Sequence, residues 1–181
     1  MKTKELKKDQ RGFTLVELLV AIAIVGIITL GITMTISQIW TINIDASNHM
    51  IAVRQVQQAG KEVSKDTLQA QNVQLGEDEG FPLILTWTDW LDVGNNVTYT
   101  ITADNKFLRT HLVNNGGEVS ETSRVIARYI DPVQTSCDWV EPTPTEPRGK
   151  LIFEVTATVG SGPQGAIETR VYEIQPRPDQ Q

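Results

Sequence analysis

The hydrophobic pattern divides the chain into an N-terminal part with a helical period and a C-terminal part with a strand period. Residues from Leu18 to Ile44 carry no charge, and a helix of that length reaches roughly 40 Å. A bilayer core needs about 20 apolar residues, so this run is long enough to cross a membrane. Apolar residues then recur at steps of three and four to about Ala70, which predicts that the helix continues with one apolar stripe. Its members are Ile39, Ile42, Ala46, Met50, Val53, Val56, Gly60, Val63 and Thr67.

From Phe81 the period changes to two, and β-branched and aromatic residues dominate. This pattern predicts six strands, at residues 83–87, 97–103, 106–113, 124–130, 151–159 and 167–174. Asp104-Asn105, the Asn-Gly run 114–117 and the Gly-rich run 160–165 predict turns between successive strands. The expected fold class is α+β, with one long N-terminal helix packed through the stripe from Ala46 to Thr67 on an antiparallel β-meander.

Two segments interrupt these patterns. Residues 74–80 hold the acidic cluster Glu77-Asp78-Glu79, for which we expect a solvated turn, since the alternating acceptors of a calcium loop are missing. Residues 131–149 contain four prolines and predict a long surface loop, either a contact surface carrying Trp139 or a variable insertion. The tail 176–181 is expected to be flexible.

The charges are distributed unevenly along the 181 residues. Of the 16 basic and 22 acidic residues, the first 12 positions hold five and two, which leaves 11 and 20 and a net charge of -9 for the remainder. An acidic body argues against a broad nucleic-acid face, so no nucleic-acid partner is expected. Because basic flanks stay in the cytoplasm, the N-terminus is expected inside and the body outside the membrane.

Candidate chemistry in the body is sparse. Cys137 is the one cysteine, so we expect a free thiol beside Trp139, in a loop or partly buried, where serine would be tolerated. His49 and His111 are too far apart in sequence for a metal motif, and Ser136-Cys137-Asp138 has no histidine nearby. No catalytic residue, metal ligand or cofactor is therefore predicted, although a membrane-tethered enzyme stays open as an alternative.

Glu17 is the exception in the apolar run, because an ionisable group inside a membrane segment costs several kcal/mol unless it is paired. A cut after Gly12 would place the free amine of Phe13 four residues before this carboxylate and supply the partner. Two alternatives to a segment cut after Gly12 are an ordinary secretory signal and a plain membrane anchor. The secretory signal lacks a small-residue cleavage site at the right place, and neither alternative explains Glu17.

The run Gly12-Phe13-Thr14-Leu15-Val16-Glu17 resembles the cleavage and methylation motif of type IV pilins and of the pseudopilins of type II secretion. The resemblance implies that a membrane aspartyl peptidase cuts between Gly12 and Phe13, that Phe13 is N-methylated, and that Glu17 sets subunit register. Gly26 also matches a frequent glycine. Met34 stands where many major pilins carry a proline. Pseudopilins and minor subunits often lack that proline.

The resemblance divides the chain into a cleaved leader (1–12), a membrane and assembly half of the helix (13–40), its amphipathic half (41–75), a β domain (76–175) and the tail. The order of strands is similar to that of the minor pseudopilins of J type and the W-type minor pilins.

These resemblances imply a structural subunit and no enzyme. Its expected partners are the prepilin peptidase and methyltransferase, membrane lipid and other pilin or pseudopilin subunits. It would wait in the cytoplasmic membrane and join a type II secretion pseudopilus or a type IV pilus tip. An adhesive or DNA-uptake minor pilin is the alternative, with a basic face made of Arg124, Arg128, Arg148, Lys150 and Arg170.

Overall fold

The computed structural model describes residues 14–144 and 148–177 as one long helix followed by eight strands. Helix α1 runs from Leu15 to Thr67 and contributes to both compact units of the chain, residues 1–43 and 44–181. The helix ends three residues before the expected boundary at Ala70. The expectation that residues up to 75 belong to the helix is wrong, because Gln71 already donates its backbone N–H to the carbonyl of Thr86 and strand β1 follows.

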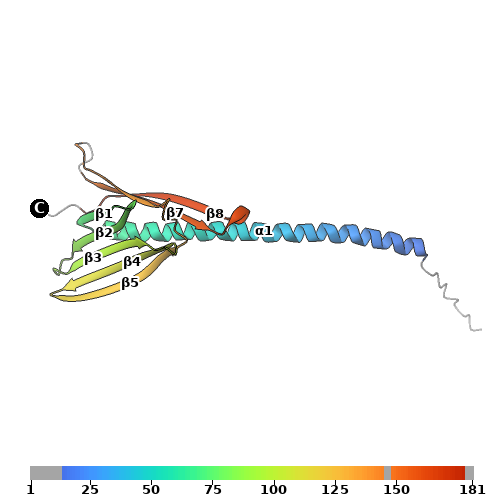
Figure 1. The fold of residues 1–181 in the computed structure, drawn as a ribbon, viewed down its shortest axis with the longest axis horizontal. Helices are drawn as coiled ribbons and strands as arrows, with labels where there is room; N and C mark the ends of the chain where they lie inside the picture. The colour runs from blue at the N-terminus through green and yellow to red at the C-terminus, as the bar shows by residue number, and fades with distance from the viewer. Residues whose placement is uncertain (1–13, 145–147, 178–181) are drawn as a thin grey trace, which may run out of the picture. The chain divides into compact units, whose positions relative to one another are not determined.

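The strands form two antiparallel sheets, both ordered as simple meanders (Figure 1). The five-stranded sheet contains β1 (Asn72–Gly76), β2 (Gly80–Thr88), β3 (Gly94–Ile101), β4 (Lys106–Asn115) and β5 (Glu118–Arg128). The three-stranded sheet contains β6 (Ser136–Val140), β7 (Lys150–Val159) and β8 (Ala166–Ile174). A short 3-10 turn, η1 (Gly162–Gln164), lies between β7 and β8. The expected α+β class, with a long helix on antiparallel strands, is confirmed.

All six predicted strands are present, and two further strands were not predicted. β1 lies where a turn was expected, and β6 lies inside the predicted loop 131–149. β6 pairs with β7, and Cys137 lies opposite Phe153 in that pairing. The expected loop position of Cys137 is wrong because the residue lies in β6, and its side chain is 2% exposed, more deeply buried than expected. The acidic cluster Glu77-Asp78-Glu79 does form an exposed turn, between β1 and β2.

The predicted turns have the backbone conformations that their residue types allow. Asn105 has a φ of 57° at the turn between β3 and β4. Gly116 and Gly117, with φ values of 59° and 99°, close the hairpin between β4 and β5. Left-handed conformations are favourable for Asn and Gly, which is why these pairs were recognisable as turns.

The chain passes from the first sheet to the second by pairing with β7. Ile130 forms an isolated antiparallel bridge with Ala157. The backbone N–H of Asp131 donates to the carbonyl of Thr156 at 2.9 Å, and that of Thr158 donates to the carbonyl of Tyr129 at 2.8 Å. Residues 129–131 therefore pair with the same edge of β7 with which β6 pairs further along that strand.

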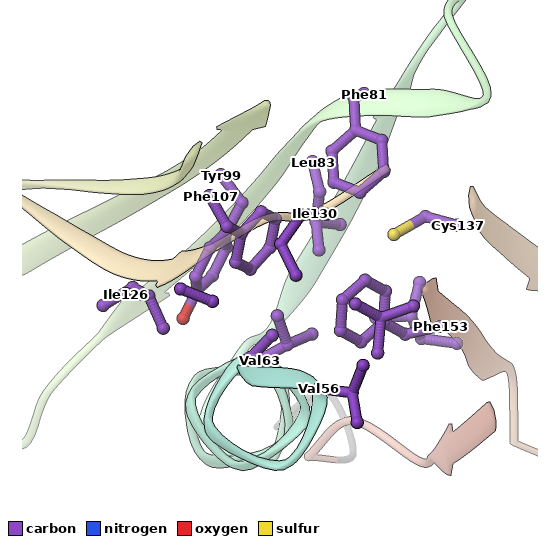
Figure 2. Packing of buried hydrophobic residues seen from close by; sticks show 14 of the residues in the cluster. Val56, Val63, Phe81, Leu83, Tyr99, Phe107, Ile126, Ile130, Cys137 and Phe153 are labelled. Atoms are coloured by element: carbon purple, nitrogen blue, oxygen red, sulfur yellow. The ribbon is translucent and has the colours of Figure 1, made fainter. Parts of the chain in front are cut away.

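One buried cluster joins the second part of α1 to both sheets (Figure 2). Val56 and Val63 of the helix point toward Leu83 and Phe107 of the five-stranded sheet and toward Phe153 of β7. At about 25 cal/mol per Å² of apolar area removed from water, such a cluster is the main stabilising contribution to the body.

The predicted helix stripe is right in its second half and wrong in its first. Val56, Gly60, Val63 and Thr67 are buried as expected, whereas Ala46 is exposed and Met50 is 62% exposed. Ala52, Ala59 and Asp66 belong to the buried face and were not predicted. The face that packs on the sheets thus begins at Ala52.

Aromatic rings connect the two sheets through the core. Tyr99 stacks on Phe107 with ring centres 5.2 Å apart, and Phe107 stacks on Phe153 at 5.8 Å. Phe153 in turn stacks on Tyr172 of β8 at 6.2 Å, and Phe81 meets both phenylalanines edge-on. Offset stacked and edge-on aromatic pairs are favoured beyond the area they bury, so this column holds the sheets to one another.

Candidate processing and assembly site

Glu17 lies in the first turn of α1 and closes a capping box with Thr14. The backbone N–H of Glu17 donates to the Thr14 hydroxyl at 3.3 Å, and the backbone N–H of Thr14 donates to Glu17 Oε2 at 3.2 Å. The Thr14 hydroxyl also donates to Oε2 at 3.2 Å. This reciprocal pair satisfies two of the N–H groups that a helix start leaves without partners.

The capping box changes the interpretation of Glu17. From the sequence, the Glu17 carboxylate is a charge in need of a cation, but in the structure Thr14 provides it with two hydrogen-bond donors. The signal was present in the sequence, since Thr and Glu three positions apart before an apolar run is the pattern of a capping box. Gly12, Phe13 and the leader 1–12 lie outside the described residues, so cleavage, methylation and the ion pair with the new amine stay predictions.

The apolar part of α1 carries a long exposed hydrophobic surface. Its most apolar window has a mean hydropathy of 2.7, and none of that window is buried within the chain. Leu19, Ile27 and Leu30 are each more than 60% exposed. By length and composition the helix can cross a membrane. Exposed apolar surface of this size marks a membrane or protein contact.

The hydroxyl groups within the apolar part are satisfied inside the helix. Those of Thr29, Thr33, Ser37 and Thr41 each donate to the carbonyl four residues earlier, at 2.8 to 3.0 Å. A hydroxyl without a partner costs free energy in lipid, and this back-bonding removes that cost. The polar side chains of this segment are therefore compatible with an apolar surrounding.

A second polar cluster lies in the body, between α1 and the five-stranded sheet. Asp66, 2% exposed, accepts from Arg109 Nε at 2.6 Å and from its Nη2 at 3.1 Å, and the Tyr99 hydroxyl donates to the same carboxylate at 2.5 Å. Burial, followed by the charge of Asp66, raises the pKa of Tyr99. Burial alone would lower the pKa of Arg109, but the hydrogen bond and charge of Asp66 outweigh it and raise that pKa.

This polar cluster has a structural role. Both sides of the Asp66 carboxylate are satisfied, and the bidentate geometry fixes the last turn of the helix on strands β3 and β4. Sequence reasoning missed it because Asp66 and Arg109 are 43 residues apart and a charged residue was not expected on a buried face.

The other candidates of the sequence analysis are not brought together. Burial raises the pKa of the Cys137 thiol above its usual range, which makes it a poor nucleophile. Among the five basic residues of the alternative face, Arg124 pairs with Glu62, Lys150 with Glu173, and Arg170 with Glu168. Within residues 14–144 and 148–177, no group of three His, Cys, Asp or Glu side chains is placed to hold a metal ion.

Residues 7–33 match the family model described as the prokaryotic N-terminal methylation motif. The matched range contains Gly12, Phe13, the capping box and the first part of the apolar helix. This finding supports the resemblance to the type IV pilin-like proteins and indicates a structural subunit that is processed and anchored in the inner membrane. No curated protein matches the chain. No solved structure matches it either.

Proposed function

We propose that this chain, which carries the N-terminal methylation motif of the type IV pilin-like proteins, is a minor pilin or pseudopilin. A prepilin peptidase cuts it between Gly12 and Phe13, Phe13 is then methylated, and the subunit is built into a secretion pseudopilus or a pilus tip. The observation that carries the proposal is the motif match over residues 7–33, which joins the cleavage junction to an apolar helix.

The exposed apolar surface of α1 supports an assembly function. Before assembly, lipid covers this surface, and the basic leader keeps the N-terminus in the cytoplasm with the body outside. In a filament the same surface is covered by the corresponding helices of other subunits. One segment serves in both surroundings because its hydroxyls bond within the helix and its remaining side chains are apolar.

The capping box supports a defined start for the helix. Because Thr14 and Glu17 satisfy each other, regular helix begins at Leu15, close to the proposed junction. After cleavage the Phe13 amine competes with Thr14 for the same carboxylate. A charged amine is the stronger partner in an apolar medium, so Glu17 exchanges Thr14 for the Phe13 amine of its own helix or of a neighbouring subunit, and the second pairing sets register.

Mass spectrometry of the protein extracted from membranes tests the proposal. We expect an N-terminal Phe13 that carries a methyl group. Gly12→Leu should leave the precursor uncut because its side chain is bulky, whereas Gly12→Ala serves as the matched small-residue control and should be processed. An intact Met1, or a cut beyond Ala23, in cells with an active prepilin peptidase would contradict the proposal.

A further inference from the structure

A groove crosses the outer face of the five-stranded sheet, opposite the face that buries Leu85. It has a volume of about 590 Å³. One row of its lining crosses four strands, because Asn72 pairs with Thr86, Thr86 with Asn96, and Asn96 with Leu112. Hairpin register therefore places side chains from distant positions in one line.

A neighbouring row gives the groove its depth. Thr88 pairs with Gly94, and Gly94 pairs with Asn114. A β-carbon built at Gly94 makes only an ordinary van der Waals contact, with Asn114 Cβ nearest at 3.9 Å. Gly94 is the first residue of β3 and has no side chain, so this row is open between Thr88 and Asn114.

Five amide side chains line the groove, and three of them, Gln71, Asn95 and Asn114, already hydrogen-bond within the fold. Among the described residues, none that lines the groove is charged. The side chains of Asn72, Thr86 and Thr88 have no hydrogen-bond partner within the described part of the chain. Asn96 uses its carbonyl oxygen to accept from Thr98, which leaves its amide group free to donate. Each amide offers two donors and one acceptor, so the groove presents both kinds of group in an uncharged setting.

These properties select one class of ligand. A nucleic acid or another phosphate compound requires cations, and a lipid chain requires an apolar groove. An extended peptide gains its main-chain hydrogen bonds at a sheet edge, not across a face. A saccharide offers neutral hydroxyls that both donate and accept, together with C–H surfaces that suit Leu112. Trp87 is among the lining residues, and Trp90 is 90% exposed in the adjoining loop between Thr88 and Gly94, so aromatic surface is available beside the amides.

We propose that this groove binds a neutral glycan, with the amides of Asn72 and Asn96 hydrogen-bonding its hydroxyls and the gap at Gly94 receiving a sugar ring. The inference concerns the body and does not depend on the processing or assembly of the N-terminal helix.

Binding of neutral glycans to the full chain in lipid nanodiscs tests the inference. Nanodiscs are used because many common detergents have sugar headgroups that would compete for the groove. The chain is applied to an array of neutral glycans, and the best tetrasaccharide is titrated by saturation-transfer NMR beside tetragalacturonate. We expect binding of a neutral glycan and none of the polyanion. Asn72→Ala and Asn96→Ala should each weaken binding about fivefold, the effect of one hydrogen bond.

Gly94→Val should weaken binding more, about tenfold or beyond, because its side chain fills the gap while favouring the strand. Gln74→Ala is the matched control, since Gln74 lies on the same face of β1 outside the groove and its loss should leave binding unchanged. Absence of binding across the array, equal binding of the polyanion, or groove variants that bind like the wild type would overturn the proposal.

Discussion

At the scale of single residues, the burial of Cys137 reverses the expectation that serine would be tolerated there. The thiol lies in the core beside Phe153, where a serine hydroxyl would be buried without a built-in partner. We expect Cys137→Ser to lower the free energy of unfolding by about 1–3 kcal/mol. Cys137→Ala, which adds no polar group, is the control and should cost less. Urea unfolding followed by tryptophan fluorescence measures both; equal effects would mean that the hydroxyl finds a partner.

The ring of Tyr172 leaves no room for a side chain at Gly60. A β-carbon built at position 60 would overlap that ring, and the Tyr172 hydroxyl donates to the carbonyl of Val56 at 3.2 Å, which keeps the ring in place. Alanine favours a helix over glycine by about 1 kcal/mol, so a free surface would be stabilised by Gly60→Ala. We expect the opposite, a loss of about 1–3 kcal/mol from overpacking.

Thermal unfolding measures the change at Gly60. Gly94→Ala is the control, because its added β-carbon makes only an ordinary van der Waals contact with Asn114. A Gly60→Ala variant that unfolds at a higher temperature than the wild type would show that Tyr172 can swing off the helix.

At the scale of elements, the Asp66 and Arg109 pair determines how α1 ends on the sheet. Arg109→Met removes the cation and leaves the buried Asp66 carboxylate with Tyr99 alone. Removing one partner of a buried ion pair typically costs about 3–5 kcal/mol, and we expect a loss of about 3 kcal/mol here because Tyr99 still donates. Urea unfolding measures this loss as a lower midpoint concentration of urea, with the slope m of the transition unchanged.

The double variant Asp66→Asn with Arg109→Met distinguishes a buried charge from lost packing. Asn keeps an acceptor for Tyr99 and carries no charge, so the double variant should regain most of the lost stability. If the double variant is as unstable as Arg109→Met, the packing of the Arg109 stem, and not the charge, holds the helix end.

The elements that the sequence predicted are those with a strong local period. β3, β4, β7 and β8 have eight to ten residues each, long enough for their β-branched and aromatic content to be recognised, and their turns contain Asn or Gly at positions with positive φ. β1 and β6 have five residues each, too few to establish a period, and they are strands because a longer neighbour pairs with them. Their positions depend on long-range pairing, which no local window contains.

The candidate site was predictable for a different reason. The junction, Glu17 and the apolar run are consecutive in sequence, so a motif identifies them without a fold. Asp66 with Arg109, and Asn72 with Asn96, come together through helix docking and strand register. The residues that hold the body together and form its groove could therefore be identified only from the structure.

At the scale of the whole molecule, the role proposed for Glu17 is to link membrane storage to assembly. Glu17→Gln keeps an acceptor for the capping box and loses the charge, whereas Glu17→Leu loses both. We expect both variants to insert and to be cut, because the Gly12-Phe13 junction is unchanged. Both should be about tenfold or more depleted from filaments, since neither can pair with the Phe13 amine.

The ratio of protein in the filament fraction to protein in the membrane fraction measures this depletion. Thr14→Ser is the control, because serine retains the capping hydroxyl and should assemble normally. If Glu17→Gln assembles like the wild type, a hydrogen bond at this position is sufficient and the charge has no part in register.

Tyr172 covers a helix that the ribosome completes much earlier, since Tyr172 and its partner Val56 are 116 residues apart. At about 5 to 20 residues per second, the buried face of α1 waits roughly 10 s for its last strand. The core cannot close during that interval, because β7 and β8 supply Phe153 and Tyr172. A nascent chain in this state has no compact body to jam a translocation channel. If the body is exported, as proposed, translocation can therefore run nearly to the C-terminus before the core closes on the far side.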